Sequence, residues 1–470
     1  MIFSTYQFIL VFLPIVFGVY FILNKLKLYT ISKIWLVIAS LYFYASGSKA
    51  FFPFFLASIF GNYSVGTALS KLQGDKHKIE RKLMLVIGVI ANIALLGYYK
   101  YIDFFLENIN FISNINIPLK HIILPIGISF FTFQLIAFLV DSYRGETKDY
   151  NIIDYLLFIT FFPQLIVGPI VHHKEMVTQF ENEENAKLNW NNIALGLFVF
   201  SIGCAKKMLL ADVLTTNAQN FFIACQTNFT FLNTWFYSLE YTISYYFDLS
   251  GYADMAIGLG LMFNIIIPQN FNSPYKATDF QEYWKRWHMT LSRFLGTYIF
   301  RNVYKKDNKW RNYYVATMVT FFVSGFWHGA GWNFIVWGII NGILVCIASY
   351  RNKKGMKAPF ILSWIINFIL VILTRVLFVS DSFTFAWHVY KGMFSLKSIV
   401  NVDWLIFWNN NWQAILTLIA GLGICLFAPN TEEISKKFKT SIPYLVYAVI
   451  LLAICLLTMD KVVNFLYFQF

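Results

Sequence analysis

The sequence predicts an all-α protein that crosses the membrane many times. Of its 470 residues, 58% are hydrophobic and 13% are charged, whereas a soluble domain carries about 25% charged residues. The apolar runs are continuous and do not alternate with polar residues, which favours helices over a membrane β-barrel. Because a helix needs ~20 residues to cross a bilayer, these runs give roughly eleven transmembrane helices, plus shorter re-entrant or interfacial helices.

The net charge of +13 would suggest a nucleic-acid partner in a soluble protein. Here the basic residues fall in short loops between apolar runs, as the positive-inside rule requires. We therefore expect the lipid bilayer and no nucleic acid as a partner. The rule places loops 71–82, 351–357 and 430–441 in the cytoplasm, and segments 102–121 and 395–411 outside.

The regularity of the apolar runs divides one membrane domain, 1–470, into three stretches. Residues 1–150 and 351–470 are ordinary spans with short loops, whereas Pro, Gly, Asp, Asn and His interrupt the runs in 151–350. Irregular backbone and ionisable groups at membrane depth are tolerated only where they are buried in protein or line a cavity. The middle stretch is therefore expected to hold the site.

His328 lies inside one long apolar run, "FFVSGFWHGAGWNFIVWGIING". Gly325 with Gly329, and Gly338 with Gly342, form small-xxx-small pairs that allow close helix packing. A packing helix whose histidine is bonded to a neighbour would explain this pattern. However, an ionisable ring at membrane depth is costly and indicates function, and a neutral imidazole can accept a proton near pH 7. The glycines beside the ring are also expected to leave room for a substrate chain.

His288 lies in "YWKRWHMTLSRFL". At helical spacing Trp284, Trp287 and His288 share one face. The segment is expected to form an amphipathic interfacial helix, which could also line a cavity and hold an anionic, phosphate-bearing donor. Three positive charges lie nearby: Lys285, Arg286 and Arg293.

The other histidines lie at span edges or in loops and are expected to be interfacial or solvated. They are His77, His121, His172, His173 and His388. The cysteines show no spacing typical of a metal site, and we expect no metal.

Several longer strings resemble one family. These are "RWHMTLSRFL", "SGFWHGAGWNFIVWG", "LPIGISFFTFQ" (124–134), "FFPQLIVGPIV" (161–171) and "YFDLSGYADMAIGLGLMFN" (246–264). Together they resemble the membrane-bound O-acyltransferases (MBOATs). More narrowly, they are similar to the bacterial branch that includes the membrane subunits of alginate and peptidoglycan O-acetyltransferases and the D-alanyl transfer protein of teichoic acids.

The resemblance implies a ring of tilted helices around a central tunnel that joins the cytosolic and external faces. It implies acyl transfer from a cytosolic thioester, acetyl-CoA in acetylating members, towards an acceptor outside. His328 corresponds to the family's hallmark histidine and His288 to its second. The string "FNSPYKATDFQEYWKRWHMTLS" (271–292) also resembles the family. The following residues fall in matching strings and are assigned to the pocket for substrate or donor: Gln134, Asp248, Asp254, Trp284, Lys285, Arg286, Trp287, Trp327 and Asn333.

The expected chemistry joins a thioester carbonyl to a hydroxyl. A base must remove the hydroxyl proton, and the developing oxyanion needs donors. We expect His328 to be the base, with His288 orienting it or stabilising charge. By resemblance, a secreted or periplasmic acetyltransferase partner completes the transfer.

The acceptor is expected to be an extracytoplasmic polysaccharide. After "TLSRFL" the chain reads "GTYIFRNVYKKDNKW", without the Arg-Asp-Tyr stretch and Pro-Leu-Gly-Gly-Asn turn of alginate-type relatives. Lysine far outnumbers arginine and Phe, Ile and Asn are abundant, which indicates an AT-rich bacterium and its cytoplasmic (inner) membrane. Both observations favour peptidoglycan, with alginate, another exported polysaccharide or D-alanyl transfer to teichoic acid as alternatives.

The sequence ends in "FLYFQF" (465–470). The last apolar run, about 443–458, is expected to exit on the external side. The ending resembles the C-terminal signature of small partner peptides in the teichoic acid system, where a tyrosine takes the acyl group. We expect this hook to present Tyr467 to His328 as an acyl relay; an aromatic membrane anchor is the alternative.

Two other classes of function stay open. Broken helices and midplane polar residues also occur in transporters and lipid flippases, although the sequence shows no internal repeat. A non-catalytic scaffold for a secreted partner is a third hypothesis.

Overall fold

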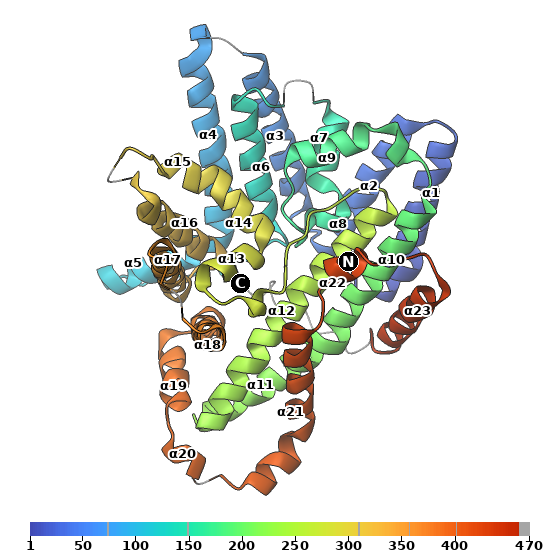
Figure 1. Cartoon of the computed structure of the whole chain (residues 1–470). Coiled ribbons are helices and arrows are strands. Elements are labelled where there is room, and N and C mark those ends of the chain that lie inside the picture. The colour runs from blue at the N-terminus through green and yellow to red at the C-terminus, as the bar shows by residue number, and fades with distance from the viewer. Residues whose placement is uncertain (73–74, 148–149, 309–310, 357, 401, 460–470) are drawn as a thin grey trace. The chain divides into compact units, whose positions relative to one another are not determined.

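Figure 1 shows the computed structural model of the chain, which describes residues 1–72, 75–147, 150–308, 311–356, 358–400 and 402–459. The described residues form helices and connecting segments, and no strand occurs in these ranges. The predicted all-α class is confirmed.

Seven helical segments of the described chain are long and apolar enough to cross a membrane. They are Gln7–Lys25, Phe52–Lys71, Lys78–Ser113, Trp190–Thr227, Trp332–Lys353, Phe360–Val379 and Trp404–Phe427. Two shorter helices, Ile128–Tyr143 and Ile442–Leu457, are also apolar. A chain with several such helices is a multi-pass membrane protein, as predicted. The total of roughly eleven stays a prediction, because it also counts shorter apolar runs.

The described helices form two compact units. The first comprises residues 1–200 and 255–268, and the second comprises 201–254 and 269–470. Two long helices, α10 (Trp190–Ala205) and α12 (Phe231–Met262), contribute residues to both.

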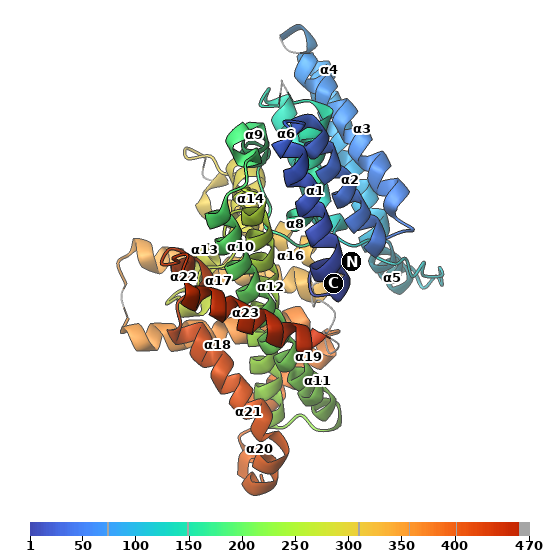
Figure 2. The same ribbon diagram turned by 90° about the vertical axis from the view of Figure 1, so that its right-hand side faces the viewer.

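The first unit is built around neighbouring membrane helices. Its elements are η1 (Gln7–Phe12), α1 (Leu13–Lys25), α2 (Tyr29–Gly47), α3 (Phe52–Lys71), η2 (Asp75–His77), α4 (Lys78–Leu96), η3 (Gly97–Tyr101), α5 (Ile102–Ser113), α6 (Ile128–Tyr143), α7 (Ile152–Thr160), α8 (Phe162–Leu165), α9 (His173–Glu181) and η4 (Glu183–Ala186). Helices α3, α4 and α6 lie side by side in both ribbon views (Figures 1 and 2).

Two glycines allow these three helices to pack closely. A Cβ at Gly66 of α3 would lie 2.2 Å from the ring of Phe138 on α6. A Cβ at Gly88 of α4 would lie 2.8 Å from the side chain of Leu139. Each large α6 side chain therefore fills the space that its facing glycine leaves.

The second unit carries the histidine strings. Its further elements are η5 (Lys206–Ala211), α11 (Asp212–Thr227), η6 (Pro274–Lys276), α13 (Phe280–Arg286), α14 (Met289–Leu295), η7 (Gly296–Phe300), α15 (Arg301–Val303), α16 (Tyr313–His328), α17 (Trp332–Lys353), α18 (Phe360–Val379), α19 (Phe383–Met393), α20 (Lys397–Val400), α21 (Trp404–Phe427), α22 (Thr431–Ser435) and α23 (Ile442–Leu457). Helix α17 packs against α13, α16 and α18.

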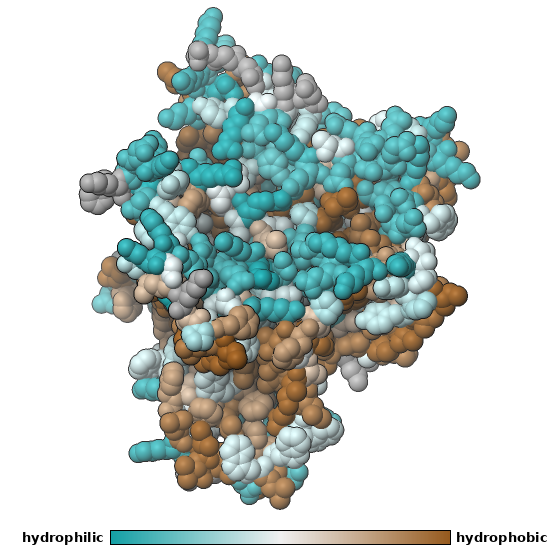
Figure 3. Space-filling view, viewed as in Figure 1, coloured by the Kyte–Doolittle hydropathy of each residue, from teal (hydrophilic) through white to brown (hydrophobic). Residues whose placement is uncertain are grey.

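Hydrophobic side chains cover the surface over α18 and α21 in Figure 3. The exposed residues of α18 include Phe360, Ile361 and Ile366, and those of α21 include Leu405 and Ile419. Water disfavours such a surface, whereas lipid chains accept it. These helices therefore carry the lipid-facing side chains expected of membrane spans.

Candidate active site

His328 is the last residue of α16, and its side chain is buried. The imidazole contacts three aromatic rings: Trp327 at 4.9 Å, Trp337 at 5.2 Å and Phe378 at 5.2 Å between ring centroids. The structure thus places this histidine inside protein, at the end of a helix and next to the α17 and α18 side chains.

Glycines hold α16 and α17 close together behind His328. A Cβ at Gly325 would lie 2.4 Å from the carbonyl oxygen of Phe334, and one at Gly338 would lie 2.5 Å from that of Phe321. The predicted close packing at these glycines is confirmed. The expected room for a substrate chain beside the ring is wrong at Gly329, because a Cβ there would lie 2.1 Å from the Phe334 ring.

The segment around His288 is a broken helix, which corrects the predicted continuous amphipathic helix. Helix α13 ends at Arg286 and α14 begins at Met289, and His288 between them adopts a left-handed backbone conformation, with φ 46° and ψ 52°. This conformation is uncommon outside glycine, asparagine and aspartate. The break turns Trp287 and His288 into the protein, where both are buried.

Asn270 orients the His288 ring. The Asn270 Oδ1 accepts from the Thr290 N–H at 3.2 Å and from the Thr290 hydroxyl at 2.8 Å. The backbone donor identifies this atom as oxygen, so the His288 Nδ1, 3.2 Å away, must donate to it. Its Nε2 then carries a lone pair, and burial lowers the pKa of His288 to about 3. His288 is therefore a neutral imidazole near pH 7.

Arg375 of α18 places a guanidinium in the same aromatic cluster. Its Cζ lies 4.5 Å from the ring centroid of Tyr245, 4.8 Å from Trp287 and 5.2 Å from Phe378. The side chain is buried, and within the described ranges no carboxylate lies at ion-pair distance from it. Its Nε has no hydrogen-bond partner among the described residues. A buried cation held mainly by π faces can still accept an anionic partner.

Phe378 links the cation to His328, since its ring contacts both groups. Trp287 links the cation to the His288 segment. The structure thus gathers both predicted histidine motifs, and an arginine that the prediction did not include, around one set of aromatic rings.

A cavity of about 220 Å³ lies beside Trp284. Its walls include Lys285, Ser292 and Ser324, and most of its surface is apolar. The Trp284 indole N–H donates to Asn341 Oδ1 at 3.2 Å, and its ring contacts Trp337, the neighbour of His328. Trp284 therefore separates the cavity from the rings around His328.

Two predicted pocket residues form ion pairs instead of facing a histidine. Asp248 pairs with Lys207 at 2.7 Å, and Lys207 also pairs with Asp212 at 2.7 Å. Asp254 pairs with Lys206 at 2.6 Å. These pairs tie α12 to η5 and the start of α11.

The remaining predicted residues are dispersed. Asn333 donates to the Ser380 carbonyl at 2.9 Å and so holds the start of α17 to the end of α18. Arg286 pairs with Glu282 at 2.8 Å. Gln134 is buried on α6 in the first unit. Tyr467 lies outside the described residues.

Sequence reasoning missed Arg375, although a signal was present. The residue interrupts the apolar string "FILVILTRVLFV" of α18, and a charge inside a hydrocarbon-length helix indicates function in the same way as His328 does. It also missed the burial of His173, which is 1% exposed and not solvated as predicted.

The fold and these groups define a multi-pass membrane protein with two buried histidines and a buried cation in one aromatic cluster. Residues 49–379 match the membrane-bound O-acyltransferase family. The chain belongs to this family and is an O-acyltransferase of the bacterial inner membrane.

Several named proteins are similar to this chain. A peptidoglycan O-acetyltransferase of Helicobacter pylori is 42% identical over 85% of this chain and 81% of its own. A probable alginate O-acetylase of Pseudomonas aeruginosa is 35% identical over 84% of this chain and 75% of its own. A teichoic acid D-alanyltransferase of Streptococcus thermophilus is 29% identical over 49% of this chain and 59% of its own.

Proposed function

We propose that the chain takes acetyl groups from cytosolic acetyl-CoA and passes them across the membrane for O-acetylation of an extracytoplasmic polysaccharide. The observation that carries this proposal is the burial of His328 against Phe378, whose ring also contacts a guanidinium with no carboxylate at ion-pair distance among the described residues. A base and a fixed positive charge in a dry site are what acyl transfer to a hydroxyl requires.

Peptidoglycan is the acceptor that we propose. The relative named for peptidoglycan is 42% identical to this chain, and the one named for alginate is 35% identical. The absence of the Pro-Leu-Gly-Gly-Asn turn after "TLSRFL" points the same way. Acetylation of alginate or another polysaccharide, and D-alanyl transfer, are the alternatives.

His328 is proposed to act as the general base. It removes the acceptor hydroxyl proton as the oxygen attacks the thioester carbonyl, and the Arg375 guanidinium stabilises the oxyanion that forms. Collapse of this intermediate breaks the C–S bond, and the proton passes from His328 to the leaving CoA thiolate. The neutral His288, held by Asn270, positions the donor by accepting at Nε2 a hydrogen bond from an amide N–H of the pantetheine arm.

The cavity beside Trp284 is proposed to admit the donor. Its apolar walls suit the pantetheine arm, and the Lys285 ammonium at its edge suits a phosphate of CoA. No metal is needed for this transfer, because the thioester is already activated and the charge is stabilised by side chains.

Tyr467 is proposed to accept the acetyl group before it leaves the membrane. The phenol oxygen would form an ester as the thioester breaks, and a secreted or periplasmic acetyltransferase would then move the acetyl group to the polysaccharide. Direct transfer from acetyl-CoA to the polysaccharide is the alternative.

Purified protein with radiolabelled acetyl-CoA tests the reaction. We expect thioester cleavage and labelled ester, and we expect His328→Ala to abolish both. His388→Ala is a matched control, because His388 stacks on Phe229 at 5.2 Å, away from the cluster. A wild-type chain that neither cleaves the thioester nor takes up label would contradict the enzyme and favour a transporter or scaffold.

Tyr467→Phe tests the relay separately. With the relay, this variant binds acetyl-CoA but forms no protein ester and does not acetylate the polymer. Full polymer acetylation by the variant would rule out the relay and leave the phenylalanines as an anchor. Incubating the wild-type protein with alginate or peptidoglycan fragments and the partner enzyme identifies the acceptor.

A further inference from the structure

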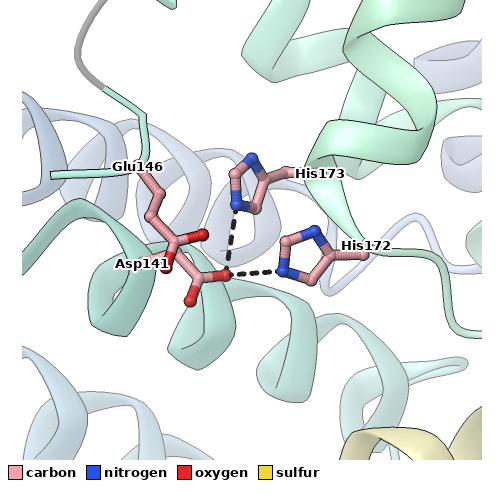
Figure 4. Close-up of side chains that lie close together, drawn as sticks. All are labelled: Asp141, Glu146, His172 and His173. Carbon is pink, nitrogen blue, oxygen red and sulfur yellow. Dashed lines mark ion pairs between the residues drawn. The ribbon is translucent and has the colours of Figure 1, made fainter. Parts of the chain in front are cut away.

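Two histidines and two carboxylates meet in the first unit (Figure 4). Asp141 lies near the end of α6, Glu146 lies in the segment that follows, and His172 and His173 lie at the start of α9. One possible ligand atom from each residue lies within 4.8 Å of the other three. The cluster lies in a different part of the chain from the candidate active site, so an inference from it is independent of the proposed function.

The spacing of the imidazoles around Asp141 suits a metal ion. The Nε2 atoms of His172 and His173 each lie 3.2 Å from Asp141 Oδ2. In a tetrahedral site with metal–ligand bonds of about 2.0–2.1 Å, neighbouring ligand atoms are roughly 3.3 Å apart. These two distances therefore match two edges of such a site.

Tyr150 orients the buried His173 ring. Its hydroxyl oxygen lies 2.7 Å from His173 Nδ1, and a metal-binding histidine commonly donates its other ring N–H to such an oxygen. In that arrangement the His173 Nε2 lone pair faces Asp141. Nε2 is buried and has no partner in hydrogen-bond geometry among the described residues.

Two electron-rich atoms that face each other repel unless a cation lies between them. A metal ion bound by both atoms would remove this repulsion.

We propose that His172, His173, Asp141 and Glu146 bind one divalent transition-metal ion of the zinc type. Two imidazoles and two carboxylates favour such an ion over Mg²⁺ or Ca²⁺, which prefer oxygen ligands alone. The ion would tie the segment after α6 to the start of α9.

Binding of the ion would change the contacts that neighbouring residues make with the proposed ligands. Arg144 Nη1 lies 3.4 Å from Asp141 Oδ1, and the His172 Nε2 lies 3.2 Å from Oδ2. Lys174 pairs with Glu146 at 2.7 Å, but its side chain is 54% exposed and can turn into water. His172 Nδ1 accepts a long 3.4 Å hydrogen bond from the Lys174 N–H. Binding of the ion at Nε2 would move the ring proton to Nδ1 and so break this bond.

Metal binding to the full chain tests the proposal. The protein is purified with an affinity tag that contains no histidine, stripped with a chelator and dialysed against Zn²⁺ or Co²⁺. We expect one tightly bound ion per chain by elemental analysis, visible absorption from the Co²⁺ form and a higher unfolding temperature with Zn²⁺. A stripped, folded wild-type chain that binds neither ion would overturn the proposal.

Variants identify the ligands. His173→Ala and the near-isosteric Asp141→Asn should lose the bound ion and the Zn²⁺-dependent rise in unfolding temperature. His77→Ala is a matched control, because His77 pairs with Glu80 at 2.8 Å outside the cluster, and it should bind as wild type does. If a variant does not fold, Glu146→Gln on the more exposed segment should still weaken binding. Equal binding by wild type and all cluster variants would mean adventitious ions only.

Discussion

His288 and His328 differ in what their surroundings allow them to do with a proton. Asn270 and burial keep His288 neutral, with Nδ1 as a donor and Nε2 as an acceptor. His328 contacts aromatic rings, and one of them, Phe378, also contacts the Arg375 guanidinium. The two residues therefore suit different tasks, with His288 positioning and His328 moving the proton.

The first prediction concerns the pH profile of a His288 variant. A group whose pKa is about 3 stays unprotonated between pH 5 and 8, so it cannot cause an acidic loss of activity in that range. His288→Gln should slow acetyl transfer about 100-fold through misplacement, and the pH at which activity falls should not move. Transfer rates of the wild type and the variant across this pH range check the prediction. If the variant loses activity at a different acidic pH from the wild type, His288 would be the base that titrates.

The second prediction concerns Arg375. Arg375→Gln should lower kcat about 100- to 1,000-fold, as the loss of an oxyanion donor does, while the KM for acetyl-CoA changes much less. Arg375→Lys should retain intermediate activity, because it keeps the charge without the planar stacking. Steady-state kinetics check this, and unfolding temperatures show whether the variants are folded. A fully active Arg375→Gln would exclude the oxyanion role.

At the scale of elements, two devices position the site. The break between α13 and α14 turns Trp287 and His288 inward. The glycine contacts between α16 and α17 bring Trp337 against His328. The first feature would be lost if α13 and α14 formed one continuous helix. The second would be lost if larger residues replaced the glycines between α16 and α17.

The third prediction tests the α16–α17 contact. Gly338→Ala would place a Cβ 2.5 Å from the Phe321 carbonyl oxygen, and such overpacking costs about 1–3 kcal/mol. We expect a lower unfolding temperature in detergent and lower activity. Gly423→Ala on α21 is the matched control, because its Cβ would meet nothing within 4 Å. Equal unfolding temperatures for the two variants would contradict the packing role.

At the scale of the whole molecule, the proposed function requires the donor and the acceptor to meet from opposite sides of a membrane. Lipid-facing side chains on helices such as α18 and α21 fit this requirement. The basic loops predict the orientation, which determines the face at which the proposed donor, acetyl-CoA, would bind.

The fourth prediction tests this orientation. The loop 351–357 is predicted to be cytoplasmic and the segment 395–411 external. A cysteine at Lys397 should react with a membrane-impermeant thiol reagent in intact cells, and one at Lys354 only after permeabilisation. The chain with its native cysteines, four of them buried, gives the background. The opposite labelling pattern would reverse the proposed direction of transfer.

Sequence reasoning identified the membrane class and the glycine contacts at Gly325 and Gly338, because composition and short-range spacing encode them. It identified the family from the resemblance of longer strings. It did not find the break at His288, because the left-handed turn depends on the distant Asn270 amide. It did not find the first-unit cluster either. Asp141 and His173 meet there through folding, and each alone is an ordinary residue at a helix end.

The rings around His328 also make its protonation visible to light. Trp327 and Trp337 both lie within contact distance of the imidazole, and a protonated imidazole quenches a neighbouring indole by accepting an excited electron. The difference in emission between the wild type and Trp337→Phe would isolate this signal from the other tryptophans. The protein thus contains its own fluorescent reporter, with which the proton could be followed at the proposed base during turnover without any added label.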